Sequence, residues 1–303
     1  PSPAAIKAGV TPRTKAVLIA HLFGAKPPLD EHIALARRHG LLFVEDCAQA
    51  FRGVGDTGHP QADASLFSFG LIKTATALGG GVLIVRRPDL LAELRTRQQD
   101  YPRQPAREHG SRILHCTALK LLSTRLGARS LFTALRLAGR DFDLPLNSRT
   151  RGFPPDRMLE LIRRQPSAAL LRLLRHRLAT FDVEHQRARS LRGRRLVQSI
   201  REVANCPAAG DEQHAFWVVP VMVDDPAALR QSLLTAGFDS TQADSMGVVP
   251  MPEHSDSADP ENARRMLQHT VFLPFYEALP PRELEQMASI IIAQQEESAA
   301  SAS

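Results

Sequence analysis

Two short segments carry side chains whose types and spacing could do chemistry. In the first, Asp46 follows a run of apolar residues and Gln49 stands three positions further on. In the second, Ser68 lies in another apolar run, Lys73 follows five residues later, and a glycine triplet occupies 79–81. A lysine framed by buried strands can have a lowered pKa, which a nucleophile that attacks a carbonyl requires. Glycines let the backbone approach a ligand closely. These segments predict a site around one lysine and one carboxylate.

Each of these residues also has a structural interpretation. Asp46 could be the N-cap of a helix, and Lys73 an ordinary loop lysine. Ser68 could be a buried strand hydroxyl and Gln49 an amide on a helix surface. Only the combined spacing favours the chemical interpretation over these alternatives.

The elements that must position these residues read as alternating strands and helices. Short apolar runs predict buried strands at 16–20, 41–44, 64–69 and 82–85, and helical periodicity predicts helices at 29–39 and 88–98. Continuous apolar strands joined by helices favour a mostly parallel sheet with helices on both faces. Asp46 would then lie at the carboxyl end of a strand, where open α/β sheets bind ligands.

The rest of the chain has a different pattern. Leu/Arg-rich helical periodicity covers 111–138 and 155–200, strands are predicted at 215–219 and 221–223, and helices at 226–236 and 283–295. The proline-rich stretch 141–155 predicts a domain boundary. We therefore expect a large domain with a helical extension at 1–145, a helical connector with a smaller α+β domain at 146–297, and a disordered tail at 298–303.

Composition narrows the class of protein. The chain has 303 residues and a formal net charge of +6, but its arginines are scattered at helical spacing and no nucleic-acid motif accompanies them. No apolar run reaches the length of a membrane span, and Pro1-Ser2-Pro3 lacks the basic and apolar pattern of a signal peptide, so we expect none. The cysteines Cys47, Cys116 and Cys206 lack metal-ligand spacing. We expect reduced thiols, no metal, no membrane or nucleic-acid partner, and a cytoplasmic location.

A wider pattern joins the two segments. The order Asp-x-x-Gln, then Phe-Ser-Phe-x-x-x-Lys, then a glycine turn into a strand, resembles the DegT/StrS-type nucleotide-sugar aminotransferases. The resemblance extends to His21-Leu22-Phe23-Gly24 and to Phe272-Leu273-Pro274. It implies the aspartate-aminotransferase fold, a type I fold of enzymes that use pyridoxal 5'-phosphate (PLP), with a partial sheet here and a smaller C-terminal α+β domain.

The resemblance also implies a role for each residue. Lys73 would hold PLP as a Schiff base and later carry the proton, and Asp46 would keep the pyridine nitrogen protonated so that the ring acts as an electron sink. Gln49 would approach the ring and its 3-oxygen. The Ser68 hydroxyl would bind the phosphate. Related sugar dehydratases carry histidine in place of the lysine, so Lys73 favours amino transfer.

The resemblance implies a PLP-dependent transaminase. It would move an amino group, with glutamate as donor, to a keto group of a nucleotide-linked sugar in polysaccharide or amino-sugar biosynthesis. We expect a homodimer. The family has a further segment before the residues seen here. In the family, a stretch equivalent to Leu161 to Ala169 also supplies an asparagine to the neighbouring subunit, and this chain has no asparagine there. The alternative is therefore a truncated, non-catalytic remnant with a structural or regulatory role.

Overall fold

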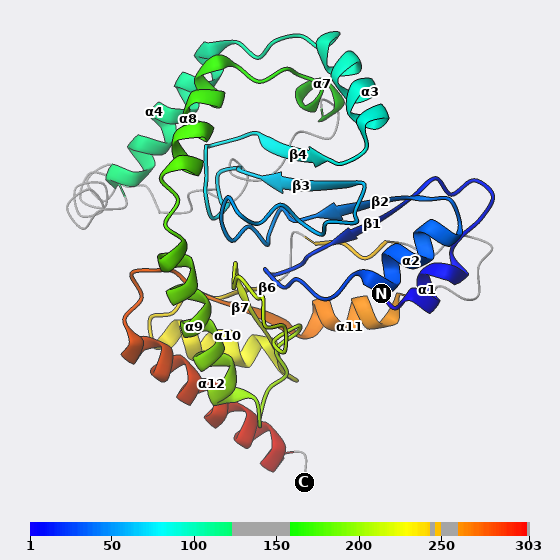
Figure 1. Cartoon of the computed structure of the whole chain (residues 1–303). Coiled ribbons are helices and arrows are strands. Elements are labelled where there is room, and N and C mark those ends of the chain that lie inside the picture. Colours follow the sequence, from blue (N-terminus) through cyan, green and yellow to red (C-terminus); the bar gives the residue numbers. More distant parts are fainter. Residues whose placement is uncertain (123–157, 243–245, 250–259, 302–303) are drawn as a thin grey trace. The chain divides into compact units, whose positions relative to one another are not determined.

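The computed structural model describes residues 1–122, 158–242, 246–249 and 260–301. Its chain forms two compact units, one made of residues 1–67 with 182–303 and the other of residues 68–181 (Figure 1). The expected domain boundary at 145/146 lies outside the described residues, and the compact units divide the chain at other places.

The first unit contains three parallel strands in the order β1-β2-β3 (Figure 1). They are β1 (Ala16–Ala20), β2 (Leu42–Asp46) and β3 (Ala64–Ser68), preceded by helix α1 (Pro3–Ala8). The register pairs Ile19 with Glu45 and Glu45 with Ser65. The parallel strands expected from the apolar runs are confirmed, and this register brings the carboxyl ends of β1 and β2 to one edge.

Helix α2 (Asp30–Arg38) packs against this sheet and forms a hydrophobic core with it, because the apolar residues of the helix recur on one side. Ile33 and Ala36 pack with Val17 and Phe43 in one cluster of buried residues. On the other side of β1, Leu18 is 61% exposed.

The C-terminal part of the first unit is an antiparallel sheet in the order β5-β7-β6 with helices around it. Its elements are α9 (Val183–Ile200), β5 (Val219–Met222), α10 (Pro226–Thr235), β6 (Thr241–Gln242), α11 (Glu261–His269), β7 (Thr270–Leu273) and α12 (Pro281–Ser301). Leu196, Leu229 and Met287, from α9, α10 and α12, bury their side chains with the strands in one core. The expected smaller α+β fold is confirmed.

The second unit holds the remaining described elements. They are β4 (Gly81–Val85), α3 (Pro88–Gln99), α4 (Ala106–Leu122), α7 (Met158–Ile162) and α8 (Ala168–Ala179). The expected continuation of the first long helix to residue 138, and the loop at 141–155, lie outside the described residues.

The helical periodicity expected over 155–200 corresponds to three helices in the described residues, and the Ser167 and Asp182 side chains cap α8 and α9 by accepting hydrogen bonds from Leu170 N and His185 N. Two other expectations about local structure are wrong. The strand expected at 215–219 begins only at Val219, since Phe216 has a left-handed φ of 49° that an extended strand excludes.

The second wrong expectation is the disordered tail. Helix α12 continues through Ser301, so the segment expected to be disordered from Ser298 is helical as far as that residue. Among the described helices, none combines the length and the apolar composition that crossing a membrane requires.

Candidate functional site

Asp46 is the last residue of β2, and its side chain closes a tight turn. Its Oδ1 accepts a hydrogen bond from Ala48 N at 2.8 Å, as an aspartate does when it initiates a turn. The described residues donate no hydrogen bond to Oδ2. One carboxylate oxygen is therefore committed to the backbone and the other can accept a proton donor.

Gln49 contacts the turn that follows β1. Its Oε1 accepts a hydrogen bond from Phe23 N at 2.7 Å. Phe23 has a φ of 63° and Gly24 a φ of 102°, so both lie in the left-handed region. The carbonyl oxygen is therefore used to hold a strained turn, and the amide nitrogen remains as a donor.

Ser68, the last residue of β3, begins the second unit, and Lys73 follows it on the other side of Gly70. A Cβ added to Gly70 would stand 3.8 Å from Ser68 Oγ and 3.9 Å from Lys73 Cγ. Lys73 N donates to the Gly70 carbonyl at 3.1 Å, which closes a turn directly before the lysine side chain. The structure thus brings these two candidate residues to one short loop.

The loop that carries Lys73 is closed at its base by Phe69. The Phe69 carbonyl accepts from Ala77 N at 2.9 Å and from Gly79 N at 3.0 Å, and Phe69 N donates to Gly80 O at 3.0 Å. Leu78, Gly79 and Gly80 have φ values of 62°, 154° and 75°. Residues with a side chain rarely adopt such φ values, which explains why glycine occupies positions 79 and 80.

Two arginines hold this loop from outside. Arg112 on α4 donates from Nη1 to the Leu78 carbonyl at 2.9 Å, and Arg177 on α8 donates from Nε to the Thr76 carbonyl at 3.1 Å. Both bonds are exposed to solvent. The lysine loop is therefore clamped by two long side chains from two helices.

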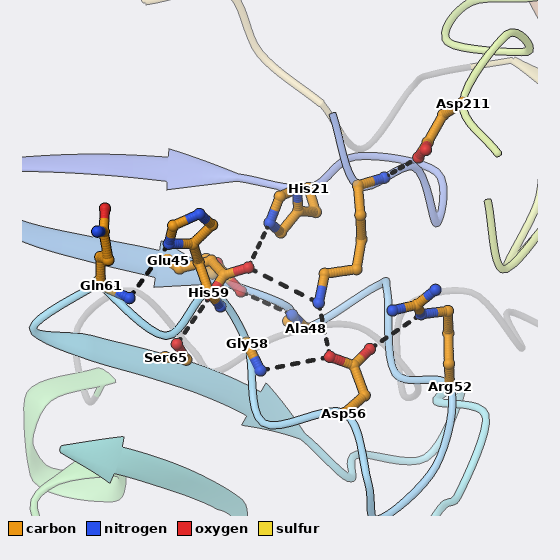
Figure 2. Close-up of polar contacts among 12 residues, drawn as sticks. His21, Glu45, Ala48, Arg52, Asp56, Gly58, His59, Gln61, Ser65 and Asp211 are labelled. Carbon is orange, nitrogen blue, oxygen red and sulfur yellow. Dashed lines mark hydrogen bonds and ion pairs between the residues drawn. The ribbon is translucent and has the colours of Figure 1, made fainter. Parts of the chain in front are cut away.

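A buried polar cluster that the sequence reasoning did not single out surrounds Glu45 in the first unit (Figure 2). Glu45 is 1% exposed. Its Oε1 lies 2.8 Å from His21 Nε2, and its Oε2 accepts from Ser65 Oγ at 2.8 Å and from His59 N at 2.6 Å. These partners come from the segment after β1, from β3 and from the loop between β2 and β3, so one carboxylate joins three parts of the chain.

Lys26 extends the cluster to a second carboxylate. Its Nζ lies 3.7 Å from Glu45 Oε1 and 2.7 Å from Asp56 Oδ1, and Arg52 Nε lies 3.0 Å from Asp56 Oδ2. The Lys26 backbone N–H donates to the Asp211 carboxylate. The cluster of His21, Lys26, Glu45, Arg52, Asp56, His59 and Ser65 is called the Glu45 cluster below.

The electrostatics of the Glu45 cluster favour ionised carboxylates. Burial by itself would raise the pKa of Glu45, but hydrogen bonds from His21, the His59 N–H and Ser65 outweigh it and hold this pKa well below its usual range. Burial is likewise outweighed at Asp56, where the bond and charge of Lys26, and then Arg52, lower the pKa. Glu45 is thus an acceptor, so His21 Nε2 carries the proton in their bond.

A metal is a poor explanation for this cluster. Ligand atoms of His21, Glu45 and Cys47 lie within 4.8 Å of one another. However, the ammonium group of Lys26 stands 3.7 Å from Glu45 Oε1 and would repel a cation. Burial also raises the pKa of the Cys47 thiol far above its usual value, so it stays protonated. The arrangement fits an ion-pair network.

The segment expected to replace the asparagine-bearing stretch has local structural contacts. Gln165 donates from Nε2 to the carbonyls of Gln99 and Tyr101 at 3.0 and 2.8 Å. Ser167, two residues later, caps α8. These residues join α3, α7 and α8 within the second unit.

One sequence signal could have revealed the Glu45 cluster. Residues of one strand alternate between faces, so Glu45 must point to the same face as Phe43, which is buried. A carboxylate on a buried face requires partners, and His21 and Lys26 are the polar residues that follow the preceding strand. Their spacing alone matched no motif.

The first part of the chain is similar to a known protein family. The family model described as the DegT/DnrJ/EryC1/StrS aminotransferase family matches residues 1–114. An L-glutamine:2-deoxy-scyllo-inosose aminotransferase from Streptoalloteichus tenebrarius is 40% identical over 109 residues, which cover 33% of this chain and 25% of that protein. A UDP-N-acetyl-3-dehydro-alpha-D-glucosamine 3-aminotransferase from Acidithiobacillus ferrooxidans is 40% identical over 99 residues, covering 30% of this chain and 26% of that protein.

Similarity in structure extends over almost the whole chain. The crystal structure of DesV from S. venezuelae matches 97% of this chain and 69% of its own, with a TM-score of 0.64 and 21% identity. The chain is thus similar in sequence to about a quarter of each curated relative, and similar in fold to about two thirds of DesV.

Proposed function

Because residues 1–114 match the DegT/DnrJ/EryC1/StrS aminotransferase family and the chain shares the fold of DesV, we propose that this protein is a PLP-dependent aminotransferase acting on a sugar-like ketone. The observation that carries the proposal is the set Asp46, Gln49, Ser68 and Lys73, whose types and spacing agree with the family at four positions. When bound, PLP supplies an electron sink that allows an amino group to leave one carbon and join another.

The first pair of residues fits the ring of this cofactor. Asp46 Oδ2 is available as a charged acceptor for a protonated pyridine nitrogen, since Oδ1 is held by Ala48 N. The Gln49 amide nitrogen is available as a donor to a ring oxygen, since Oε1 is held by Phe23 N. Each side chain thus has one polar atom that holds it in place through a backbone N–H and a second polar atom that can bind the cofactor.

The second pair fits the aldehyde and phosphate ends. Lys73 follows a hydrogen-bonded turn and would bind the aldehyde carbon covalently through Nζ, then carry a proton on the same atom after it is displaced. Ser68 Oγ, on the other side of Gly70, would donate to a phosphate oxygen. Lys73 is thus the residue proposed to touch the reacting atoms.

The decisive experiment is a trapping reaction with PLP. The protein is incubated with PLP and reduced with borohydride, and the modified peptide is identified by mass spectrometry. Lys73→Ala should abolish the adduct, whereas Lys15→Ala, which removes an exposed lysine, should leave it unchanged. An adduct that is missing from the wild type, or that persists in Lys73→Ala, would refute the proposal and favour the non-catalytic remnant.

The finer identity of the substrates is also a proposal. We infer a nucleotide-linked keto sugar as acceptor, since one relative is named for a UDP-linked substrate and the chain carries a net charge of +6 that suits a phosphorylated ligand. We infer glutamate as donor, and a cytoplasmic homodimer. The name of the other relative specifies L-glutamine and a scyllo-inosose, an acceptor without a nucleotide.

Spectral titration separates these options. Glutamate should bleach the visible absorbance of the PLP-loaded protein, and a UDP-linked keto sugar should restore it. Bleaching by glutamine alone, or restoration by an unlinked keto cyclitol alone, would assign the inosose type of substrate instead. Light scattering of the same sample tests the dimer.

A further inference from the structure

We propose that His21 and Glu45 are positioning residues that hold Asp46 and Gln49 in the geometry needed for cofactor binding. This inference rests on the proposed function, because Asp46 and Gln49 are the residues proposed to contact PLP. Neither His21 nor Glu45 would touch the cofactor. They would act through hydrogen bonds to the backbone and side chains beside it.

His21 is the residue that joins the two parts of the arrangement. Its backbone N–H donates to the Asp46 carbonyl at 2.9 Å, and its ring Nε2 lies 2.8 Å from Glu45 Oε1. Figure 2 shows the ring directed at the Glu45 carboxylate. Since the His21 ring and the Glu45 carboxylate are both buried, with His21 2% and Glu45 1% exposed, the contact has little room to rearrange.

Glu45 anchors the residue directly before Asp46. It lies opposite Ile19 and Ser65 in the sheet, and its Oε2 accepts from Ser65 Oγ and His59 N. The approach is so close that a Cβ on Gly58, whose φ is 83°, would stand 2.3 Å from Glu45 Oε2. The side chain of Glu45 thereby fixes the end of β2, and so the direction in which Asp46 leaves the strand.

The same arrangement reaches Gln49 through the turn after β1. Phe23, two residues after His21, donates its backbone N–H to Gln49 Oε1 at 2.7 Å. Phe23 and Gly24 have positive φ values, so the turn needs external bonds to persist. Moving His21 would therefore move the hydrogen-bond partner of Gln49 as well as the carbonyl of Asp46.

Amide hydrogen exchange in the cofactor-free protein tests this positioning directly. The amides of Ala48 and Phe23 report on the Asp46 and Gln49 side chains that accept their hydrogen bonds. In His21→Leu, which removes the ring donor, both amides should exchange about ten-fold faster or more. In His21→Gln, whose amide nitrogen can replace Nε2 as donor to Glu45, exchange should return to within about two-fold of the wild type.

Asp63→Asn is the matched control. Asp63 Oδ2 accepts from Phe43 N at 2.7 Å, so it is a carboxylate–amide bond at the opposite end of β2. Asparagine keeps an oxygen acceptor but loses the charge, so the bond from Phe43 N weakens, and the amides of Ala48 and Phe23 should stay unchanged. Unchanged exchange in His21→Leu, or equal acceleration in Asp63→Asn, would overturn the inference whether or not the protein binds PLP.

A second readout uses the PLP-loaded protein without substrate. His21→Leu should weaken PLP binding about ten-fold and shift the pH midpoint of the visible absorbance band, because that band senses the contact of Asp46 with the ring. A purely structural role would lower stability and leave this midpoint in place. If the wild type forms the trapped adduct but the midpoint of His21→Leu does not move, the positioning role is wrong and the proposed function stands. If the wild type forms no adduct, the proposed function fails, and hydrogen exchange alone decides whether His21 positions Asp46 and Gln49.

Discussion

The two regions that carry the candidate residues are held in place by opposite means. In the first unit, the Glu45 cluster fixes the end of β2 with charges that are almost fully buried, since Glu45 is 1% and Lys26 8% exposed at the side chain. In the second unit, the loop that carries Lys73 is held by Arg112 and Arg177, whose bonds to backbone carbonyls face solvent.

The contrast between buried and exposed contacts indicates which region is the more rigid. A buried charge without its partner costs several kcal/mol, so a buried network permits essentially one arrangement. An exposed arginine–carbonyl bond competes with water and contributes about 1 kcal/mol or less. We therefore expect the first region to fail as a whole when one member is removed, and the second to loosen locally.

The largest effect should come from removing the cation that lies between two buried carboxylates. Lys26→Met leaves Glu45 without its charge partner and Asp56 with Arg52 only. We expect a loss of about 3–5 kcal/mol in the free energy of unfolding, measured by urea denaturation. Combining it with Asp56→Asn should lose less than the sum of the two single changes, because the residues interact.

Arg97→Met is the control for this change. It breaks an exposed i,i+4 pair with Glu93 and should cost under about 1 kcal/mol. Equal losses from Lys26→Met and Arg97→Met would remove the contrast between buried and exposed contacts.

A pH-dependent loss of nearly the same size should come from His214, a buried residue of the first unit. Its Nδ1 accepts a hydrogen bond from Phe216 N at 2.9 Å, which requires a neutral ring. Burial, with Arg194 adding to it and Asp211 opposing it, lowers the pKa of His214 from 6.5 to about 4. The unfolded chain therefore binds a proton below pH 6.5 that the folded chain does not, and stability present above pH 6.5 falls as the pH drops towards 4.

The size of that loss is on the order of 3 kcal/mol. Unfolding measured at several pH values should show it in the wild type and show a flatter profile in His214→Asn, whose Oδ1 can still accept from Phe216 N. His39→Gln, at an exposed histidine, should keep the wild-type slope. An identical slope in His214→Asn would mean that this ring does not set the acid response.

The smallest effect is expected in the lysine loop. Arg112→Ala removes the donor to the Leu78 carbonyl and should change the free energy of unfolding by about 1 kcal/mol or less. Exchange at the Ala77 and Gly79 amides, which close the loop on Phe69, should nevertheless accelerate. Arg107→Ala, at an exposed arginine of the same helix, should leave these amides unchanged. A global loss as large as that of Lys26→Met would show that the loop is as rigid as the buried cluster.

Much of the fold was predictable because local patterns are strong where strands are buried. The runs expected at 16–20, 64–69 and 82–85 correspond to β1, β3 (64–68) and β4 (81–85), since a short apolar run between turns has few alternatives. The error at residues 215–218 has a physical cause, because Phe216 adopts φ 49° to lie against Gly193, where an added Cβ would stand 2.3 Å from its ring. No local pattern encodes that contact.

The sequence by itself was enough to predict a cofactor site, since the prediction of Asp46, Gln49, Ser68 and Lys73 rests on residue type and spacing alone. Tertiary structure decided how the first two are held, because His21, Lys26 and Ser65 meet Glu45 only when β1, β2 and β3 align in register. Partners of a buried charge are chosen by distance in space, and a separation of 20 to 24 positions along the chain conceals that distance from any sequence motif.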